Sequence, residues 1–195
     1  MVRRIRNSVR GVDLVGLDDE LLCSRKIFLT DEISADTTNE VIKQLMCLYN
    51  DDPDKEITLY INSPGGEVTS GLAVYDYLSA INTPIRTVCI GLAASMGAIL
   101  FLAGDKREML PHTRLMIHDP CFEHAEMGGK KPHEIKHELD KLNETREIIV
   151  KIIAEKTGKS EKEIKKVTAD DTYYNAGEAV EFGLATGILE KGEAI

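Results

Sequence analysis

Apolar side chains recur along the chain with two different periods, and together these predict alternating strands and helices. Short apolar runs bounded by charged or turn-forming residues are typical of buried strands, whereas apolar residues spaced three and four apart mark one face of a helix. The runs that predict strands are 26–29, 57–61, 85–90, 114–117 and 184–189. The helical stripes are 36–49, 68–81, 98–103, 132–156 and a segment ending at Phe182. This alternation favours an α/β fold with a largely parallel sheet.

The longest predicted helix begins at Pro132, a residue suited to the first turn of a helix. Its apolar stripe consists of Ile135, Leu139, Leu142, Ile149 and Ile153. At ~1.5 Å per residue this helix is roughly 37 Å long, about the width of a domain of this size. A long helix with so narrow a stripe packs either on a partner subunit or along its own domain, and the pattern leaves both open.

Three other segments carry weaker signals. Residues 1–24 have no clear period, so we expect an N-terminal arm that is mobile or depends on a partner, followed by a single domain over residues 25–195. Asp36 is expected to cap the helix that starts beside it. Residues 105–108 are expected to form a hairpin tip.

The stretch Gly91–Ala98 joins a buried strand to an apolar helix through a turn of small residues, with Ser95 at the junction. Small neighbours let the backbone turn sharply and leave the hydroxyl open, and free N–H groups at a helix start can hold an oxyanion. The nucleophile-elbow pattern Gly-x-Ser-x-Gly is only approximated, because Ala93 replaces the first glycine. Ser95 is therefore a candidate nucleophile, although close packing alone also produces such stretches.

Composition narrows the classes of function. A chain of 195 residues with 43% hydrophobic and 29% charged residues fits one globular domain with a substantial core. A formal charge of −9 argues against a nucleic-acid-binding surface, and no apolar run approaches the ~20 residues that span a membrane. The basic start of the chain has no apolar segment behind it, unlike a secretory signal. The four cysteines are widely spaced, so we expect no disulfide and a reducing, cytoplasmic location.

A serine hydroxyl is a poor nucleophile unless a positioned base takes its proton. Among the five histidines, His118 stands out because it ends an apolar strand. Ligands of open α/β sheets gather at the carboxyl ends of the strands, where Ser95 is also predicted to lie. The acid that would orient the base is Asp119, Asp170 or Asp171, and the residues alone leave that choice open.

His133 to His137 matches the zinc motif H-E-x-x-H on a predicted helix. The extended form of the motif fails, because Asp140 and Asn143 stand where a glycine and a third histidine would be. The surrounding residues are heavily charged. We therefore expect a solvated helix face here, and no metal site.

Several stretches of the chain together resemble the proteolytic subunit of the Clp protease. They are Tyr60–Gly66 (Tyr-Ile-Asn-Ser-Pro-Gly-Gly), Gly91–Ala98, Leu110-Pro111, Met116–Pro120 (Met-Ile-His-x-Pro) and Glu178–Leu184. They occur in the order and near the spacing of that family, and the resemblance covers about residues 25–190.

The resemblance implies a crotonase-like α/β fold with a mainly parallel sheet and a protruding handle helix, and it implies a serine endopeptidase. Carried over by motif, Ser95 is the nucleophile, His118 the general base and Asp171 the acid that orients it. The backbone N–H groups of Gly66 and Met96 would form the oxyanion hole, which agrees with the position of Met96 directly after the nucleophile. The residues expected to contact substrate are Val68, Cys121, Phe122 and Glu123.

The same resemblance implies particular partners. The chain is expected to form heptameric rings stacked as a tetradecamer around a closed chamber, with the long helix packing ring on ring. Unfolded polypeptide would be delivered by an AAA+ unfoldase ATPase. ATP would bind only to that partner, because this chain has no P-loop, and no cofactor, nucleic acid or membrane is expected.

Three departures from the family pattern bear on these expectations. Asp170 stands where the family usually has an arginine that pairs across the ring–ring interface, Asp119 replaces a common glutamine after the base, and residues 7–14 match poorly. Asp170 and the poorly matching N-terminal residues motivate an alternative, a weakly active structural or regulatory ring subunit that works beside a second paralogue. A crotonase-like acyl-CoA enzyme is disfavoured, because it would have no need for His118 and Asp171.

Overall fold

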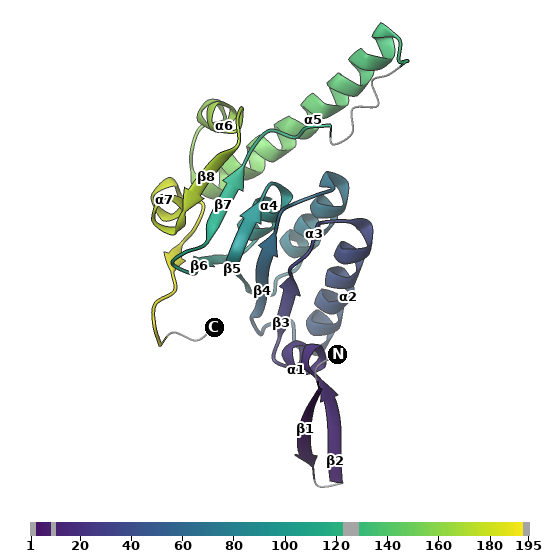
Figure 1. Ribbon diagram of the computed structural model, residues 1–195, viewed down its shortest axis with the longest axis vertical. Coiled ribbons are helices and arrows are strands. Elements are labelled where there is room, and N and C mark those ends of the chain that lie inside the picture. Colours follow the sequence, from purple (N-terminus) through teal and green to yellow (C-terminus); the bar gives the residue numbers. More distant parts are fainter. Residues whose placement is uncertain (1–2, 9–10, 123–128, 193–195) are drawn as a thin grey trace.

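A seven-stranded sheet forms the centre of the molecule in the computed structural model, which describes residues 3–8, 11–122 and 129–192 (Figure 1). Its strands are β3 (Lys26–Leu29), β4 (Ile57–Ser63), β5 (Ile85–Ala94), β6 (Lys106–Met109), β7 (Arg114–Ile117), β8 (Thr172–Asn175) and β9 (Gly187–Ile188). The order along the main path is β3-β4-β5-β6-β9, and β7 pairs with both β5 and β8. Every pairing is parallel except that of β7 with β8. The predicted α/β fold with a mainly parallel sheet is confirmed.

Helices cover the sheet and complete the core. They are α1 (Leu17–Cys23), α2 (Ala35–Asp51), α3 (Val68–Ala80), α4 (Met96–Leu102), α5 (Pro132–Thr157), α6 (Glu161–Val167) and α7 (Ala176–Phe182). All seven residues of α4 are buried, which explains why its sequence is apolar on every side. Strand β4 is buried on both faces along most of its length, as expected of a central parallel strand.

Strand β5 changes partner along its length, and this change positions the candidate site. Its first part pairs with β6 through Arg86–Cys89, and its last part pairs with β7 through Leu92–Ala94. Strands β5 and β7 run in the same direction, so their carboxyl ends lie side by side. The residues that follow them, Ser95 and His118, are therefore brought together by the sheet itself.

Two elements project from the body at opposite ends (Figure 1). The buried residues of α5 are confined to its second half, from Ile149 to Ile153, whereas Ile135 and Leu139 are exposed. Its second half therefore packs along its own domain, and its first half protrudes. At the other end, β1 (Arg3–Ser8) and β2 (Gly11–Gly16) form an antiparallel hairpin that the sequence pattern did not predict.

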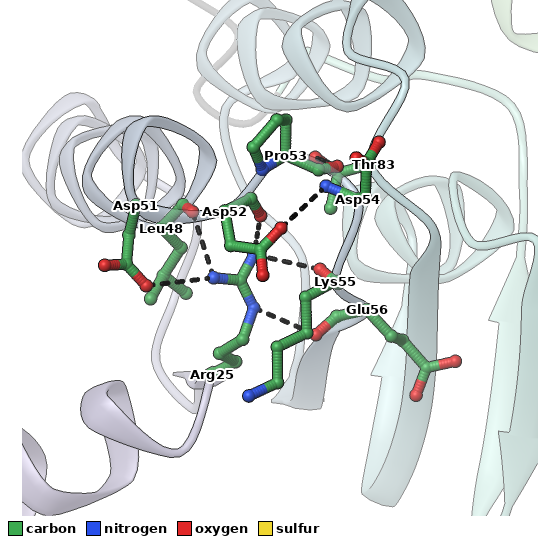
Figure 2. A network of polar contacts seen from close by, with 9 residues as sticks. All are labelled: Arg25, Leu48, Asp51, Asp52, Pro53, Asp54, Lys55, Glu56 and Thr83. Atoms are coloured by element: carbon green, nitrogen blue, oxygen red, sulfur yellow. Dashed lines mark hydrogen bonds and ion pairs between the residues drawn. The ribbon is translucent and has the colours of Figure 1, made fainter.

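Arg25 ties the exit of this N-terminal arm to the body (Figure 2). Its side chain is 4% exposed, and its guanidinium donates to the carbonyls of Leu48, Asp52, Lys55 and Glu56 at 2.8–3.2 Å. The carbonyls at the end of a helix have no partner within the helix. Arg25 therefore caps α2 and holds the following loop, at a junction where its own φ is +60°.

Several local predictions were wrong. Residues 105–108 are not a hairpin tip: Lys106–Met109 is strand β6, because the charge of Glu108 is matched by Arg86 on β5 at 2.6 Å. Helix α2 is capped by Ser34 rather than Asp36, through a hydrogen bond from the Thr37 N–H. Strand β9 covers only Gly187–Ile188, and β8 was not predicted.

Candidate active site

Ser95 occupies a strained position between β5 and α4. Its φ of +52° and ψ of −123° lie in a region that a residue with a side chain rarely adopts. The Ser95 N–H donates to the Met116 carbonyl at 2.9 Å, which anchors this turn to β7. Strain of this kind in a strand-to-helix turn is a property of the nucleophile elbow, which exposes the hydroxyl at the end of the sheet.

His118 reaches both Ser95 and Asp171. Its Nε2 atom lies 2.8 Å from Ser95 Oγ, and its Nδ1 atom lies 3.1 Å from Asp171 Oδ1. The register of β7 and β8 explains the second contact. Their last paired residues are Ile117 and Thr172, so one further step in an antiparallel register sets His118 opposite Asp171.

Of the three acids that the sequence left open, the structure thus brings Asp171 to His118. Asp119 lies one residue further along, where side chains of an extended chain point the opposite way. Its Oδ2 atom forms an ion pair with Arg146 Nε at 2.7 Å, and its Oδ1 atom accepts a hydrogen bond from Thr168 at 2.6 Å. Asp170 is exposed.

The backbone positions predicted for an oxyanion hole lie beside Ser95. A parallel bridge joins Ile33 to Gly66, and its two hydrogen bonds use the neighbouring Gly65 carbonyl and Glu67 N–H. The Gly66 N–H therefore points away from Ile33. A Cβ on Gly65 would lie 2.7 Å from Ser95 Cβ and 3.2 Å from Met96 N, so the glycine loop packs directly against the start of α4.

Met96 is the first residue of α4, and N–H groups in the first turn of a helix have no acceptor within the helix. The Met96 N–H therefore adjoins the serine as the prediction requires. A developing negative charge at this point would meet the Met96 N–H.

Two hollows open beside the serine. One is a groove, and Val68, Cys121 and Phe122 of the predicted substrate residues line it together with Ser95, His118 and Gly66. Glu123, the fourth, lies outside the described residues. The other hollow is a narrow apolar pocket beneath the same serine and histidine.

Sequence reasoning missed the residues that form the walls of this apolar pocket. They include Ile99, Ile117, Pro120, Ile149 and Ile153. Ile149 and Ile153 are part of the stripe that predicted helix α5, so their periodicity was visible. What the pattern did not indicate is that this stretch of the helix lies beneath the serine.

Comparison of the sequence with known proteins assigns the chain to a family. The family model described as Clp protease matches residues 10–192. The chain belongs to the Clp protease family. It is 42% identical over 175 residues to the ATP-dependent Clp protease proteolytic subunit 1 of Prochlorococcus marinus strain MIT 9312, covering 88% of this chain and 87% of that protein.

A second relative, subunit 1 of Prochlorococcus marinus strain NATL2A, is 38% identical over 191 residues, covering 96% of this chain and 94% of the relative. A protein of Parasynechococcus marenigrum strain WH8102 named subunit 2 is 38% identical with the same coverage. Membership of the Clp protease family makes the chain a peptidase, a hydrolase of peptide bonds.

The H-E-x-x-H match lies away from this Clp protease site. His133 and His137 are both exposed on the protruding half of α5. Within the described ranges, no group of three or more histidine, cysteine or acidic side chains could hold a metal ion. Among the same residues, no helix is both long and apolar enough to cross a membrane.

Proposed function

We propose that this chain is the proteolytic subunit of an ATP-dependent Clp protease and that it acts as a serine endopeptidase on unfolded polypeptide. The observation that carries the proposal is the continuous chain of contacts from Ser95 Oγ through His118 to Asp171, at 2.8 and 3.1 Å. Serine, histidine and acid in this relation are recognised by geometry rather than by their order along a sequence.

In the first half of the reaction an extended peptide lies in the groove with its scissile carbonyl carbon against Ser95 Oγ. His118 Nε2 takes the hydroxyl proton as the oxygen–carbon bond forms, and Asp171 stabilises the resulting imidazolium. The negative charge on the carbonyl oxygen is held by the N–H groups of Gly66 and Met96.

His118 then gives its proton to the leaving amine nitrogen as the carbon–nitrogen bond breaks. The product is an acyl-enzyme on Ser95. A water molecule then attacks the ester carbon while His118 accepts its proton. The bond from that carbon to Ser95 Oγ breaks, His118 returns the proton to Oγ, and the acid product leaves. These steps use no metal and no organic cofactor, and ATP is used by the partner ATPase only.

The assembly we propose is a cytoplasmic tetradecamer of two stacked heptameric rings, fed by an AAA+ unfoldase. The protruding half of α5 supports the stacking, because Ile135 and Leu139 on it are 36% and 48% exposed. Apolar side chains grouped on an unpacked helix favour burial against another chain.

The alternative, a subunit whose site is completed by a second paralogue, has one observation in its favour. The Asp171 side chain is 60% exposed, so solvent weakens the electrostatic interaction between Asp171 and His118 in the isolated chain. Contacts from a neighbouring ring would then be needed to align the three residues.

Labelling with a fluorophosphonate probe tests the proposal. We expect the purified chain to be modified at Ser95, as read by mass spectrometry, and Ser95→Ala to abolish both labelling and peptide hydrolysis. Loss of a triad nucleophile costs ~10⁴-fold or more in rate, while removal of one hydroxyl leaves the fold intact. Hydrolysis that survives in pure Ser95→Ala protein would exclude the assignment. Hydrolysis and labelling that appear only after a second paralogue is added would support the alternative.

A further inference from the structure

Asp119 directly follows the base, yet its carboxylate faces away from the serine and links the segment after β7 to two helices, α5 and α6. On one side it meets Arg146 of helix α5, with 2.7 Å between Oδ2 and Nε. On the other side it meets Thr168, the residue that ends α6, by accepting the Thr168 hydroxyl at 2.6 Å. The Asp119 N–H also donates to the Thr168 carbonyl at 2.6 Å.

Thr168 stands three residues before Asp171, so these contacts link the segment that carries the base to the segment that carries its acid. Thr168 is 1% exposed, and its N–H donates to the Ile164 carbonyl at 2.9 Å, which fixes it to α6. The only described contact between the base and acid side chains themselves is the 3.1 Å contact at the exposed Asp171. The backbone pairing of β7 with β8 already joins these two segments, and Asp119 and Thr168 add a second connection beyond the last residue pair of that ladder.

Arg146 extends this connection to the protruding helix. It lies one turn before Ile149 and two turns before Ile153, on the same face of α5. Those two isoleucines form part of the apolar pocket beneath Ser95 and His118. A shift of α5 would therefore change the pocket wall and the Arg146–Asp119 ion pair together.

We propose that Asp119, Thr168 and Arg146 form a positioning clamp, which holds His118 in line with Ser95 and Asp171 and makes that alignment depend on the seating of helix α5. The clamp rests on the proposed serine mechanism. None of its three residues touches the reacting atoms, so their effect is on the alignment of the base. Because the first half of α5 is exposed and free to meet another chain, a partner bound there gains a physical route to the active site.

The test uses the assembled protein and three variants, Asp119→Asn, Arg146→Gln and Thr168→Val. We expect each to lower kcat for a short fluorogenic peptide about tenfold or more, because small displacements of a catalytic group cost rate steeply. KM should stay within about twofold, since the residues do not line the groove. Fluorophosphonate labelling of Ser95 should slow in step with kcat.

Two matched controls separate positioning from general stability. Thr168→Ser keeps the hydroxyl and should retain most of the activity that Thr168→Val loses. Glu147→Gln breaks a neighbouring tie between α5 and α6, the 2.7 Å ion pair with Lys165, and should leave kcat unchanged. The double variant of Asp119→Asn and Arg146→Gln should be no slower than the worse single variant, because both break one connection.

Unchanged kcat in Asp119→Asn and Arg146→Gln, with the wild type labelled at Ser95, would overturn the clamp and leave the serine mechanism standing. A loss of kcat that merely follows the fraction of unfolded or dissociated protein, or that is equal in Thr168→Ser and Thr168→Val, would also overturn it. Hydrolysis that persists in Ser95→Ala would instead overturn the proposed function.

Discussion

At the scale of single residues, Ser95 depends on the absence of a side chain next to it. The backbone of Gly65 runs so close that a Cβ there would lie 2.7 Å from both Ser95 Cβ and the Ala94 carbonyl oxygen. Its φ of +99° also disfavours any other residue. Two independent reasons therefore require glycine at this position, and the first of them concerns the space around the serine.

Gly65→Ala is expected to reduce peptide hydrolysis by about a hundredfold, because the added methyl displaces the serine and the glycine loop relative to each other. The measurement is kcat together with the rate of Ser95 labelling. Gly187→Ala is the matched control, since no atom lies within 4 Å of the Cβ it would add. Normal labelling in Gly65→Ala would mean that the loop relaxes without moving the serine.

At the scale of elements, strand β6 is held to β5 by backbone pairing and by ion pairs around the buried carboxylate of Glu108. Glu108 is 5% exposed, and its two carboxylate oxygens meet Arg86 Nε at 2.6 Å and Lys106 Nζ at 2.9 Å. Burial alone would raise the pKa of Glu108, but hydrogen bonds from Lys106 and Arg86 outweigh it and hold the pKa below its usual value of 4.5.

This lowered pKa predicts a specific acid sensitivity. A carboxylate whose pKa is lower in the folded than in the unfolded state contributes stability that is fully present above about pH 4.5 and is lost as the pH falls through the folded pKa. Glu108→Gln should therefore flatten the decline of unfolding free energy below that pH, and destabilise by about 3 kcal/mol at neutral pH. Denaturant titrations between pH 3 and pH 7 measure both. The control is Glu163→Gln, which removes an ion pair on the surface. Equal slopes in wild type and Glu108→Gln would contradict the prediction.

The same strand shows why some elements were not predictable from sequence. In Lys106-Arg107-Glu108 the charges are typical of a turn. The strand buries Glu108 because that carboxylate meets Arg86, which is twenty-two residues earlier in the chain. Strand β8 has a single buried residue, Tyr174, so its pattern is weak. By contrast β4 and the first part of β5 are buried on both faces, and their apolar runs predicted them directly.

Some residues of the candidate site could also be predicted from local sequence, and one could not. Ser95 and His118 were predicted because each ends an apolar strand, a local feature. The acid was not, because the geometry that sets Asp171 rather than Asp119 against the histidine is the antiparallel register of β7 with β8, residues far apart in sequence. Family resemblance supplied that residue where periodicity left three open.

At the scale of the whole molecule, the question is how firmly two rings would stack. Asp170 is exposed beside Asp171, in the position where the family usually has an arginine that pairs across the ring–ring interface. A carboxylate there cannot make that pairing. At an interface that repeats around a ring, carboxylates facing one another would repel.

We therefore expect wild-type protein at neutral pH to sediment partly as single rings, with more double rings as salt is raised and the repulsion is screened over a Debye length of ~8 Å at 0.15 M. Asp170→Arg should sediment as double rings at low salt. Asp170→Asn is the control that separates the two causes, because it removes the repulsion without adding a cation. If Asp170→Asn matches Asp170→Arg, repulsion alone weakens the stack, and if only the arginine variant gains, the missing pairing is the cause. Stable double rings for the wild type at both low and high salt, with no gain for either variant, would show that α5 and its exposed apolar residues hold the rings together without help from this position.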